Sequence, residues 1–328
     1  MMMDHEFENN AHGFPHSPHK SALSLAATET SSLSDSSSLG CADTVAEKQP
    51  GDIMKIYDSL SSEEVEQAAL HSFRYYETRD ETKRDAYAIA QVRRHYIAEK
   101  FDVHSAIRKM KATLKWREKI GIDAMRKTAN AHSTDCESVN HMRNILEKDM
   151  ETGKVYVMGY DRDGRALYIV TPAKKNSENE EDVIRSHIYT LERCIACTER
   201  KTNGEQERII CVFDFNNFSR KHSYPLKIIG KVFGVLKAHY PERIANMYFL
   251  DTSIVSRSVW AIVKPFVDPV TKKKICFVQG KKLKDKVFES LIDAEQASPI
   301  LRSDGKMSTP FNADVFLNVP FDQSYCHL

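Results

Sequence analysis

Apolar residues in the first half of the chain recur at helical spacing, and this pattern predicts a small helical subdomain. The pattern runs from Leu60 to about Ile122. It opens with Ser61 and Glu64, a pair whose side chains can each bond a backbone N–H that a helix start leaves without a partner. We assign this helical subdomain to residues 53–125.

Beyond about residue 150, short apolar runs alternate with segments of helical spacing. The predicted strands are 155–158, 166–170, 209–213, 247–250 and 275–278. The predicted helices are 183–199, 226–239, about 257–266 and 281 to about 294. Residues 160–164 separate the first two strands and contain the Asp and Gly residues of a hairpin turn. Such alternation is typical of an α/β domain with a largely parallel sheet, which we assign to residues 126–295.

The two ends of the chain lack this patterning. Residues 1–52 are rich in serine, histidine and acidic side chains and show no sustained apolar period, so they predict a disordered tail. Residues 296–328 are predicted to form an irregular C-terminal extension. The four histidines of the tail are typical of a solvated segment, and we expect no metal and no cofactor in this protein.

Charge and composition indicate the partner and the compartment. The whole chain has a net charge of +1, but residues 1–50 hold seven acidic and two basic residues, a net charge of −5 that leaves about +6 for the rest. This asymmetry favours an anionic surface over nucleic acid. The sequence has no run of roughly 20 apolar residues and no signal peptide at its start. Its seven cysteines stand at irregular spacings, so we expect a cytoplasmic protein with reduced thiols.

Two local motifs that suggest catalysis or redox chemistry have simpler interpretations. Cys194 and Cys197 form one C-x-x-C pair late in a predicted helix, without the second pair that a zinc site of this type needs. Asp161 and Asp163 follow a predicted strand, as in phosphatases with an aspartate nucleophile, but no downstream acidic motif supplies the magnesium site and the same residues make a good turn. We therefore predict that this protein is not an enzyme.

Several motifs in a fixed order closely resemble the CRAL-TRIO lipid-binding family. They are Phe101-Asp102-Val103, Lys115-Trp116-Arg117, Asp163-Gly164-Arg165, His239-Tyr240-Pro241-Glu242-Arg243-Ile244, Met247-Tyr248-Phe249-Leu250, Val263-Lys264-Pro265-Phe266-Val267-Asp268-Pro269-Val270-Thr271 and Lys274-Ile275. The resemblance covers about residues 60–295 and is nearest to the fungal phosphatidylinositol/phosphatidylcholine transfer branch. It implies a sheet that floors an apolar lipid pocket, a gate helix that closes the pocket, and a helical subdomain before them.

The resemblance also implies which residues bind the lipid. Glu242, Thr271 and Lys274 match the residues that hold an inositol phosphate headgroup in the family. The set suits that headgroup chemically, because the lysine is a cation for the phosphate and the other two side chains are acceptors for the ring hydroxyls. We expect Lys274 to face inward. Tyr168 matches one of the two tyrosines that the fungal branch offers to the phosphatidylcholine headgroup.

The segment from Ser256 to Val267 is predicted to form the gate. Its apolar residues cover more than one helical face, so some stay apolar and exposed after one side has packed. The predicted gate and membrane-contact residues are Val259, Trp260, Ile262, Val263 and Phe266. An ordinary core helix is the alternative interpretation. Seven lysines between Lys272 and Lys286 either form a solvated face or draw the gate to an anionic membrane.

Four positions depart from the pattern of the resembled family. Glu99 stands where the family has a basic residue near the headgroup phosphate, and a carboxylate there repels phosphate. Ile209 and Cys211 replace a serine and a threonine, and Val157 replaces the second headgroup tyrosine. These changes weaken the case for phosphatidylcholine more than the case for phosphatidylinositol.

The sequence as a whole predicts a soluble, monomeric carrier that encloses one phospholipid, phosphatidylinositol, and exchanges it at a membrane surface that it touches transiently. Two alternatives stay open. One is a CRAL-TRIO carrier of a non-phospholipid hydrophobe that resembles tocopherol, a retinoid or squalene, which Glu99 favours and Lys274 opposes. The other is a regulator that presents bound lipid to a lipid kinase.

Overall fold

The computed structural model describes residues 49–129, 136–267, 269–307 and 311–325, without the side chains of Val263 and Phe266. The predicted disordered tail of residues 1–52 lies almost wholly outside the described residues. The helices that precede the sheet are α2 (Pro50–Asp58), α3 (Ser62–Ala69), α4 (Phe73–Thr78), α5 (Arg84–Ala98), α6 (Val103–Ile120), α7 (Ile122–Lys127) and α8 (Glu137–Met150), with the short 3-10 helix η1 (Glu81–Lys83).

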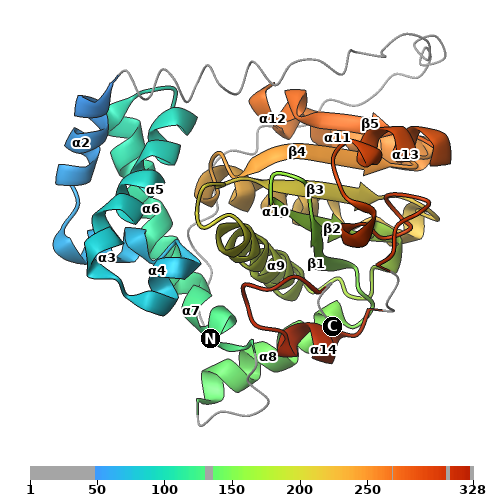
Figure 1. The fold of residues 1–328 in the computed structure, drawn as a ribbon, viewed down its shortest axis with the longest axis horizontal. Helices are drawn as coiled ribbons and strands as arrows, with labels where there is room; N and C mark the ends of the chain where they lie inside the picture. The colour runs from blue at the N-terminus through green and yellow to red at the C-terminus, as the bar shows by residue number, and fades with distance from the viewer. Residues whose placement is uncertain (1–48, 130–135, 268, 308–310, 326–328) are drawn as a thin grey trace. The chain divides into compact units, whose positions relative to one another are not determined.

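The starts of these helices follow the local sequence. Ser61 caps α3, since its hydroxyl accepts from the backbone N–H of Glu64 and the Glu64 carboxylate accepts from that of Ser61, which confirms the predicted capping pattern. Asp102 caps α6 by accepting from the N–H of Ser105 at 2.7 Å. Helices α2 to α6 share a compact apolar core of their own (Figure 1).

A five-stranded sheet follows the helices. Its strands are β1 (Val155–Tyr160), β2 (Ala166–Val170), β3 (Ile209–Asp214), β4 (Ile244–Leu250) and β5 (Ile275–Val278), and they lie in this order across the sheet. β1 pairs antiparallel with β2, and the other neighbours are parallel. The predicted α/β class, with a largely parallel sheet after a helical region, is therefore confirmed. The predicted domain boundaries at residues 52, 125 and 295 stay predictions.

Parallel neighbours need crossover connections, and helices supply them. The connecting elements are η2 (Pro172–Lys174) and α9 (Glu180–Lys201) after β2, η3 (Arg220–His222) and α10 (Leu226–His239) after β3, and α11 (Ile254–Val263), η4 (Lys264–Phe266) and α12 (Pro269–Lys273) after β4. Helix α13 (Lys281–Glu289), η5 (Ala294–Gln296) and α14 (Ala313–Asn318) follow β5. The helix predicted over 281–294 thus ends at Glu289, because the chain turns there and the N–H groups of Leu291 and Ile292 both bond to the carbonyl of Phe288.

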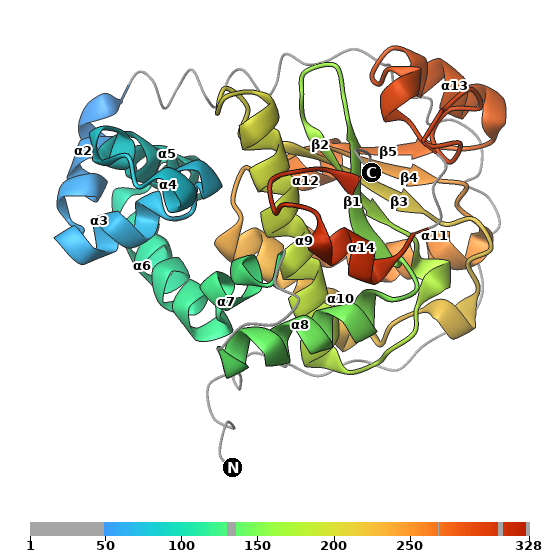
Figure 2. The same cartoon turned by 60° about the horizontal axis from the view of Figure 1, so that its bottom comes forward.

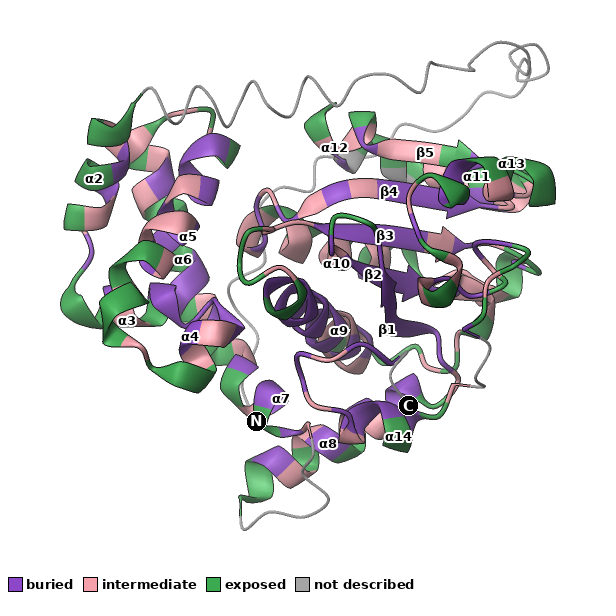
Figure 3. Ribbon diagram, viewed as in Figure 1, coloured by how far each residue is buried: buried purple, intermediate pink, exposed green. Residues whose placement is uncertain are grey.

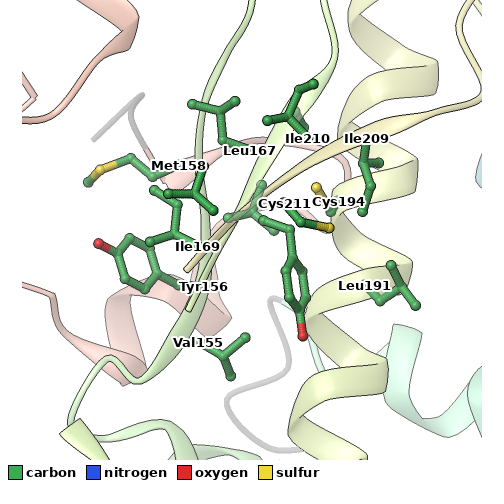
Figure 4. Close-up of a cluster of buried hydrophobic side chains, with 14 of the residues drawn as sticks. Val155, Tyr156, Met158, Leu167, Ile169, Leu191, Cys194, Ile209, Ile210 and Cys211 are labelled. Carbon is green, nitrogen blue, oxygen red and sulfur yellow. The ribbon is translucent and has the colours of Figure 1, made fainter. Parts of the chain in front are cut away.

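Alternate residues of the strands point to opposite faces of the sheet. One face, which we call the cavity face, carries Tyr168, Val170, Cys211, Phe213, Met247 and Phe249. The other, the closed face, carries Leu167, Ile169, Ile210, Val212, Tyr248 and Leu250, all of them buried. Figure 3 shows that strands β1 to β3 are buried over almost their whole length and that helix α9 is buried over most of its length. Figure 4 shows part of this core, with Cys194 of α9 beside Cys211 of β3.

The closed face is sealed by the chain that follows β5, which consists of α13 and of residues 296–328, the part predicted to be an irregular extension. Tyr248 packs against Phe288 of α13, and the carbonyl of Gln296 lies against Gly159 of β1. The chain then passes over the edge strand β1 to α9 (Figure 2). There the fully buried guanidinium of Arg193 donates to the carbonyls of Phe316, Val319, Pro320 and Gln323. Phe316, Leu317 and Phe321 of this segment belong to the core that the sheet forms.

A buried polar seam joins the early helices to the sheet region. Glu192 of α9 accepts from Arg126 of α7 at 2.7 Å, from Arg117 of α6, and from the hydroxyl of Tyr240 at 2.7 Å. Burial alone raises the pKa of Glu192, but the two guanidiniums outweigh it and lower the pKa to about 2. On the same seam Trp116 stacks on His239, with ring centroids 4.0 Å apart.

Within the described residues, every helix is too short or too polar to cross a bilayer.

Candidate functional site

A largely apolar cavity lies over the cavity face of the sheet. Its volume is about 140 Å³, and about 1150 Å³ of free space lies between its lining atoms when the open side is included. The sheet supplies its floor, while α9, α10 and α11 supply its walls. The wall residues from α10 are Ile228, Ile229, Val232, Phe233 and Leu236, those from α9 are Val183, His187 and Leu191, and those from α11 are Ser256, Val259 and Trp260.

Aromatic rings close the cavity on the side of α11. Trp260 meets the ring of Phe249 edge-on, with centroids 5.4 Å apart, and Phe249 meets Phe213 in the same way at 5.2 Å. Of the predicted gate residues, Val259 and Trp260 therefore line the cavity, whereas Ile262 is half exposed on the outer side. The side chains of the other two, Val263 and Phe266, lie outside the described part of the structure.

Exposed apolar residues gather on the same stretch of chain. Five of the eight large apolar residues that are exposed in the described part fall between residues 254 and 283: Ile254, Ile262, Val270, Phe277 and Leu283. Ile254, the most exposed, keeps 85% of its surface open. Lysines 273, 281, 282 and 286 are exposed on the same stretch, while Lys284 pairs with Asp251 at 2.8 Å. The outer side of α11 to α13 thus combines apolar and cationic groups.

The predicted headgroup residues lie at the amino ends of β4 and β5. Lys274 is only 6% exposed, as predicted, and its ammonium donates to the carbonyl of Ile244 at 2.9 Å. The same ammonium lies 3.5 Å from the Glu242 carboxylate, and the backbone N–H of Lys274 bonds to the carbonyl of Thr271. The structure brings these residues together, but none of the three lines the cavity described above. Their role in binding a headgroup stays a prediction.

Tyr168, the fourth predicted headgroup residue, does line the cavity. Its hydroxyl lies 2.5 Å from Nδ1 of His187 on α9. Sequence reasoning missed His187, although a signal for it exists: Val183, His187 and Leu191 are four residues apart and share one face of α9. A histidine on an otherwise apolar helical face indicates a buried polar group, and only the fold shows that this face borders a cavity.

A second set of polar residues lies at the carboxyl edge of the parallel strands, opposite the edge that holds Lys274. Lys154 and Lys175 lie 5.9 and 5.4 Å from the ring of Tyr224, and all three line the cavity. Lys154 is paired with Asp149 at 2.7 Å, and burial lowers the pKa of this lysine. The Tyr224 hydroxyl is buried without a hydrogen-bond partner in the described part, and burial raises its pKa.

The residues that depart from the family pattern occupy defined places. Glu99 follows the last turn of α5 and is half buried. Cys211 lines the cavity as the cross-strand neighbour of Tyr168, and burial raises its pKa to about 12, so the thiol stays protonated. Ile209 and Val157 are fully buried in β3 and β1. The cavity floor therefore carries few hydroxyl groups besides that of Tyr168.

The motifs that suggested other chemistry are explained by local structure. Cys194 and Cys197 are both buried in α9. Asp161 accepts from the backbone N–H groups of Asp163 and Arg165 and from the Arg165 guanidinium, which is the geometry of the predicted hairpin turn. Among the residues that the structure describes, no three His, Cys, Asp or Glu side chains are grouped so that they could hold a metal ion.

Comparison with known proteins assigns the sheet region. Residues 150–298 match the model of the CRAL/TRIO domain. The chain is 26% identical over 211 residues to the phosphatidylinositol transfer protein PDR17 of Saccharomyces cerevisiae, which covers 62% of this chain and 54% of that protein. It is 24% identical over 196 residues to the Sec14 cytosolic factor of Schizosaccharomyces pombe, which covers 59% of this chain and 67% of the relative.

The chain thus spans about half to two thirds of the length of these two relatives. Among solved structures, the crystal structure of Sfh5 matches with a TM-score of 0.48 and 17% sequence identity, over 78% of this chain and 85% of that one. The family match covers both the strands that floor the cavity and the helices α9 to α11 that wall it. We conclude that residues 150–298 of this chain are a CRAL/TRIO domain.

Proposed function

We propose that this protein carries one lipid in the apolar cavity and exchanges it at a membrane surface without covalent chemistry. The observation that carries the proposal is the cavity itself, an apolar chamber whose outer wall, α11, is continuous with a stretch of exposed apolar residues. A buried core helix has no reason to leave Ile254 and Ile262 in water. If α11 moves into a bilayer, these exposed apolar residues become buried among the lipid chains.

The energetics of a bare lipid explain why a carrier is needed. Each methylene that moves from hydrocarbon into water costs about 0.8 kcal/mol, so two acyl chains face a barrier of tens of kcal/mol in free transfer. A cavity as apolar as the bilayer replaces that barrier with a near-balanced exchange. The aromatic and aliphatic lining of the cavity supports this role.

Docking of α11 to a membrane has support from charge as well as from apolar surface. The exposed lysines of the segment 273–286 flank the exposed apolar residues in the sequence. Each basic residue held close to an anionic leaflet contributes about 1 kcal/mol. We propose that the protein works as a monomer in the cytosol, in keeping with the name of the Schizosaccharomyces pombe relative, and touches the membrane transiently.

Phosphatidylinositol is the lipid we propose. The name of the Saccharomyces cerevisiae relative points to it, and the cluster of Glu242, Thr271 and Lys274 supports it. Lys274 has three N–H donors, of which one bonds firmly to the Ile244 carbonyl and one faces Glu242 at 3.5 Å. A donor therefore remains for a phosphate oxygen, and Glu242 is an acceptor for ring hydroxyls.

Transfer of fluorescent phosphatidylinositol between vesicles tests the lipid identity through Lys274→Met. We expect wild-type protein to transfer the lipid and the variant to lose about tenfold or more of the rate, because a charge-assisted hydrogen bond contributes about 1.5–3 kcal/mol. Lys284→Met is the matched control, since Lys284 also pairs with an acid but lies on α13. Equal transfer by wild type and Lys274→Met would reject the headgroup assignment, and no transfer by wild type would reject the carrier.

Trp260 reports on the gate independently of ligand identity. In a Trp116→Phe background, Trp260 is the remaining tryptophan, and its fluorescence should shift to the blue when vesicles are added. The shift should grow with anionic lipid and weaken with salt, because exposed lysines are screened over a Debye length of about 10 Å at 0.1 M. Trp260→Ala should slow lipid exchange. Unchanged fluorescence together with unchanged exchange would leave α11 as an ordinary wall helix.

A further inference from the structure

His187 and Tyr168 form a polar pair in the lining of the largely apolar cavity. Tyr168 comes from the sheet floor and His187 from the α9 wall, and Nδ1 of the histidine lies 2.5 Å from the tyrosine oxygen. Between them they make one hydrogen bond. The structure gives neither Nε2 of His187 nor the tyrosine hydroxyl a second partner in the described part of the chain.

Both members of the pair are electrically neutral. Burial, with a further contribution from Lys154, lowers the pKa of His187 to about 4. Burial likewise raises the pKa of Tyr168 far above its ordinary value, so this hydroxyl keeps its proton. At neutral pH the pair therefore holds two protons on polar atoms, one on the tyrosine oxygen and one on the imidazole.

The mutual bond uses only one of these protons, whichever tautomer the histidine adopts. If the tyrosine donates to Nδ1, the imidazole proton is on Nε2 and lacks an acceptor. If Nδ1–H donates to the tyrosine oxygen, it is the hydroxyl proton of Tyr168 that lacks an acceptor. In both arrangements one N–H or O–H donor is left in an apolar cavity, where a donor without a partner is unfavourable.

The surroundings of the pair determine what kind of acceptor fits. The nearest buried charges, on Lys154 and Asp149, neutralise each other at 2.7 Å, and Ser186 also donates to Asp149. Lys175, the other lysine in the described lining of the cavity, is paired with Glu178. Among the described lining residues, therefore, neither lysine is an uncompensated cation for a phosphate or a carboxylate, whose charge is costly to bury alone. A neutral oxygen is the acceptor that this part of the cavity can take.

We infer that His187 and Tyr168 form a donor site for one neutral oxygen atom of the bound lipid, inside the cavity and apart from the Glu242, Thr271 and Lys274 cluster. The inference rests on the proposed carrier function and narrows its ligand. A pure hydrocarbon leaves the donor without a partner and is disfavoured. Two sources supply the same chemistry: an ester carbonyl of a diacyl lipid, or the hydroxyl of a neutral lipid.

Two matched pairs of probe lipids separate these sources. The first pair is dioleoyl phosphatidylinositol and its dialkyl ether analogue, which lacks the ester carbonyls. The second pair is cholesterol and cholestane, which lacks the hydroxyl. Delipidated full-length protein is incubated with vesicles that contain both members of one pair in equal amounts, and the lipid that it retains after re-isolation is counted by mass spectrometry.

We expect wild-type protein to prefer the oxygen-bearing member of one pair by about three- to tenfold, the effect of one net hydrogen bond. Each single variant, Tyr168→Phe or His187→Leu, keeps one donor and should keep much of the preference. Tyr168→Phe/His187→Leu removes both donors and should abolish it. Because both polar partners become apolar together, the double variant should remain folded. Leu167→Met is the control, since Leu167 adjoins Tyr168 in β2 but faces the other side of the sheet.

The outcomes distinguish this inference from the proposed function. Preference within the first pair assigns the site to an ester carbonyl, and preference within the second assigns it to a hydroxyl. Lipid uptake by wild type without preference in either pair overturns the inference, as does a preference that persists in the double variant. These two results leave the carrier function standing, whereas no uptake of any probe by wild type overturns the carrier function and the inference together.

Discussion

The closed face and the cavity face of the sheet are built from alternating residues of the same strands, yet they are covered in different ways. On the closed face the backbone after β5 approaches so tightly that a Cβ on Gly159 would lie 2.1 Å from the carbonyl oxygen of Gln296. On the cavity face, α10 crosses the sheet with only Ile228 of its 14 residues buried. Gly230 and Gly234 lie within this helix, and a Cβ on either would meet no atom of another element within 4 Å.

The difference teaches how one sheet can be both stable and able to open. Tight backbone approach and hydrogen bonds to buried carbonyls hold the closed face in one arrangement. The cavity face instead packs against side chains that end at a void, and its wall helices carry exposed or half-exposed residues. Rigid packing on one side lets the other side lose contacts without loss of the whole fold.

The largest expected effect comes from Arg193, which holds the C-terminal segment in place. Arg193→Met leaves the carbonyls of Phe316 and Val319 buried without donors, so we expect a loss of about 3–5 kcal/mol in the free energy of unfolding. Denaturant unfolding measures it. Arg200→Met is the matched control on the same helix: the Arg200 side chain is 56% exposed and makes one ion pair, with Asp322, so its loss should cost clearly less than the loss of Arg193. Equal losses in the two variants would mean that Arg193 does not anchor the segment.

The same substitution should have opposite effects on the two faces. Gly159→Ala meets the Gln296 carbonyl and forces alanine to adopt φ near +80°, so we expect it to destabilise the protein by about 2–4 kcal/mol. Gly230→Ala adds a methyl group in open space within α10 and should stabilise the protein by about 0.5–1 kcal/mol. Thermal unfolding of both variants checks the signs. Destabilisation by Gly230→Ala would contradict a loosely packed cavity wall.

Mild acid should loosen α5 and the cavity side before the closed face. Burial lowers the pKa of both His187 in the cavity and His95 in α5 to about 4, against about 6.5 when unfolded. Between these pH values the unfolded chain binds more protons, so stability is complete above about pH 6.5 and falls towards pH 4. At about pH 5.5 each of the two histidines should lower the free energy of unfolding by about 1.4 kcal/mol relative to its value above pH 6.5.

Hydrogen exchange at neutral pH and at about pH 5.5 measures this difference by region. Residues 288–325, which cover the closed face, contain no histidine. Their amide protection should therefore change less than that of α5 and α9. A uniform loss of protection across both regions would show that the histidines act through global unfolding alone.

The sequence predicted the sheet well because its strands are short apolar runs between clear turn signals. The strands over 166–170 and 275–278 and the helix over 226–239 match the structure at both ends. The site was predicted only in part. Tyr168, Val259 and Trp260 line the cavity, whereas the Glu242, Thr271 and Lys274 cluster lies outside its described lining. His187 was missed, because a helical period places it on an apolar face but does not say that this face borders a void.

What the sequence determined by itself is local: the helix caps at Ser61 and Asp102, the turn at Asp161, and the alternation that gives a parallel sheet. These features depend on contacts within a few residues or on a regular period. The tertiary structure alone decided that the C-terminal segment seals the closed face and that His187 meets Tyr168. Arg193 and Phe316 are 123 residues apart, and no local pattern records a contact that forms only when distant segments pack together.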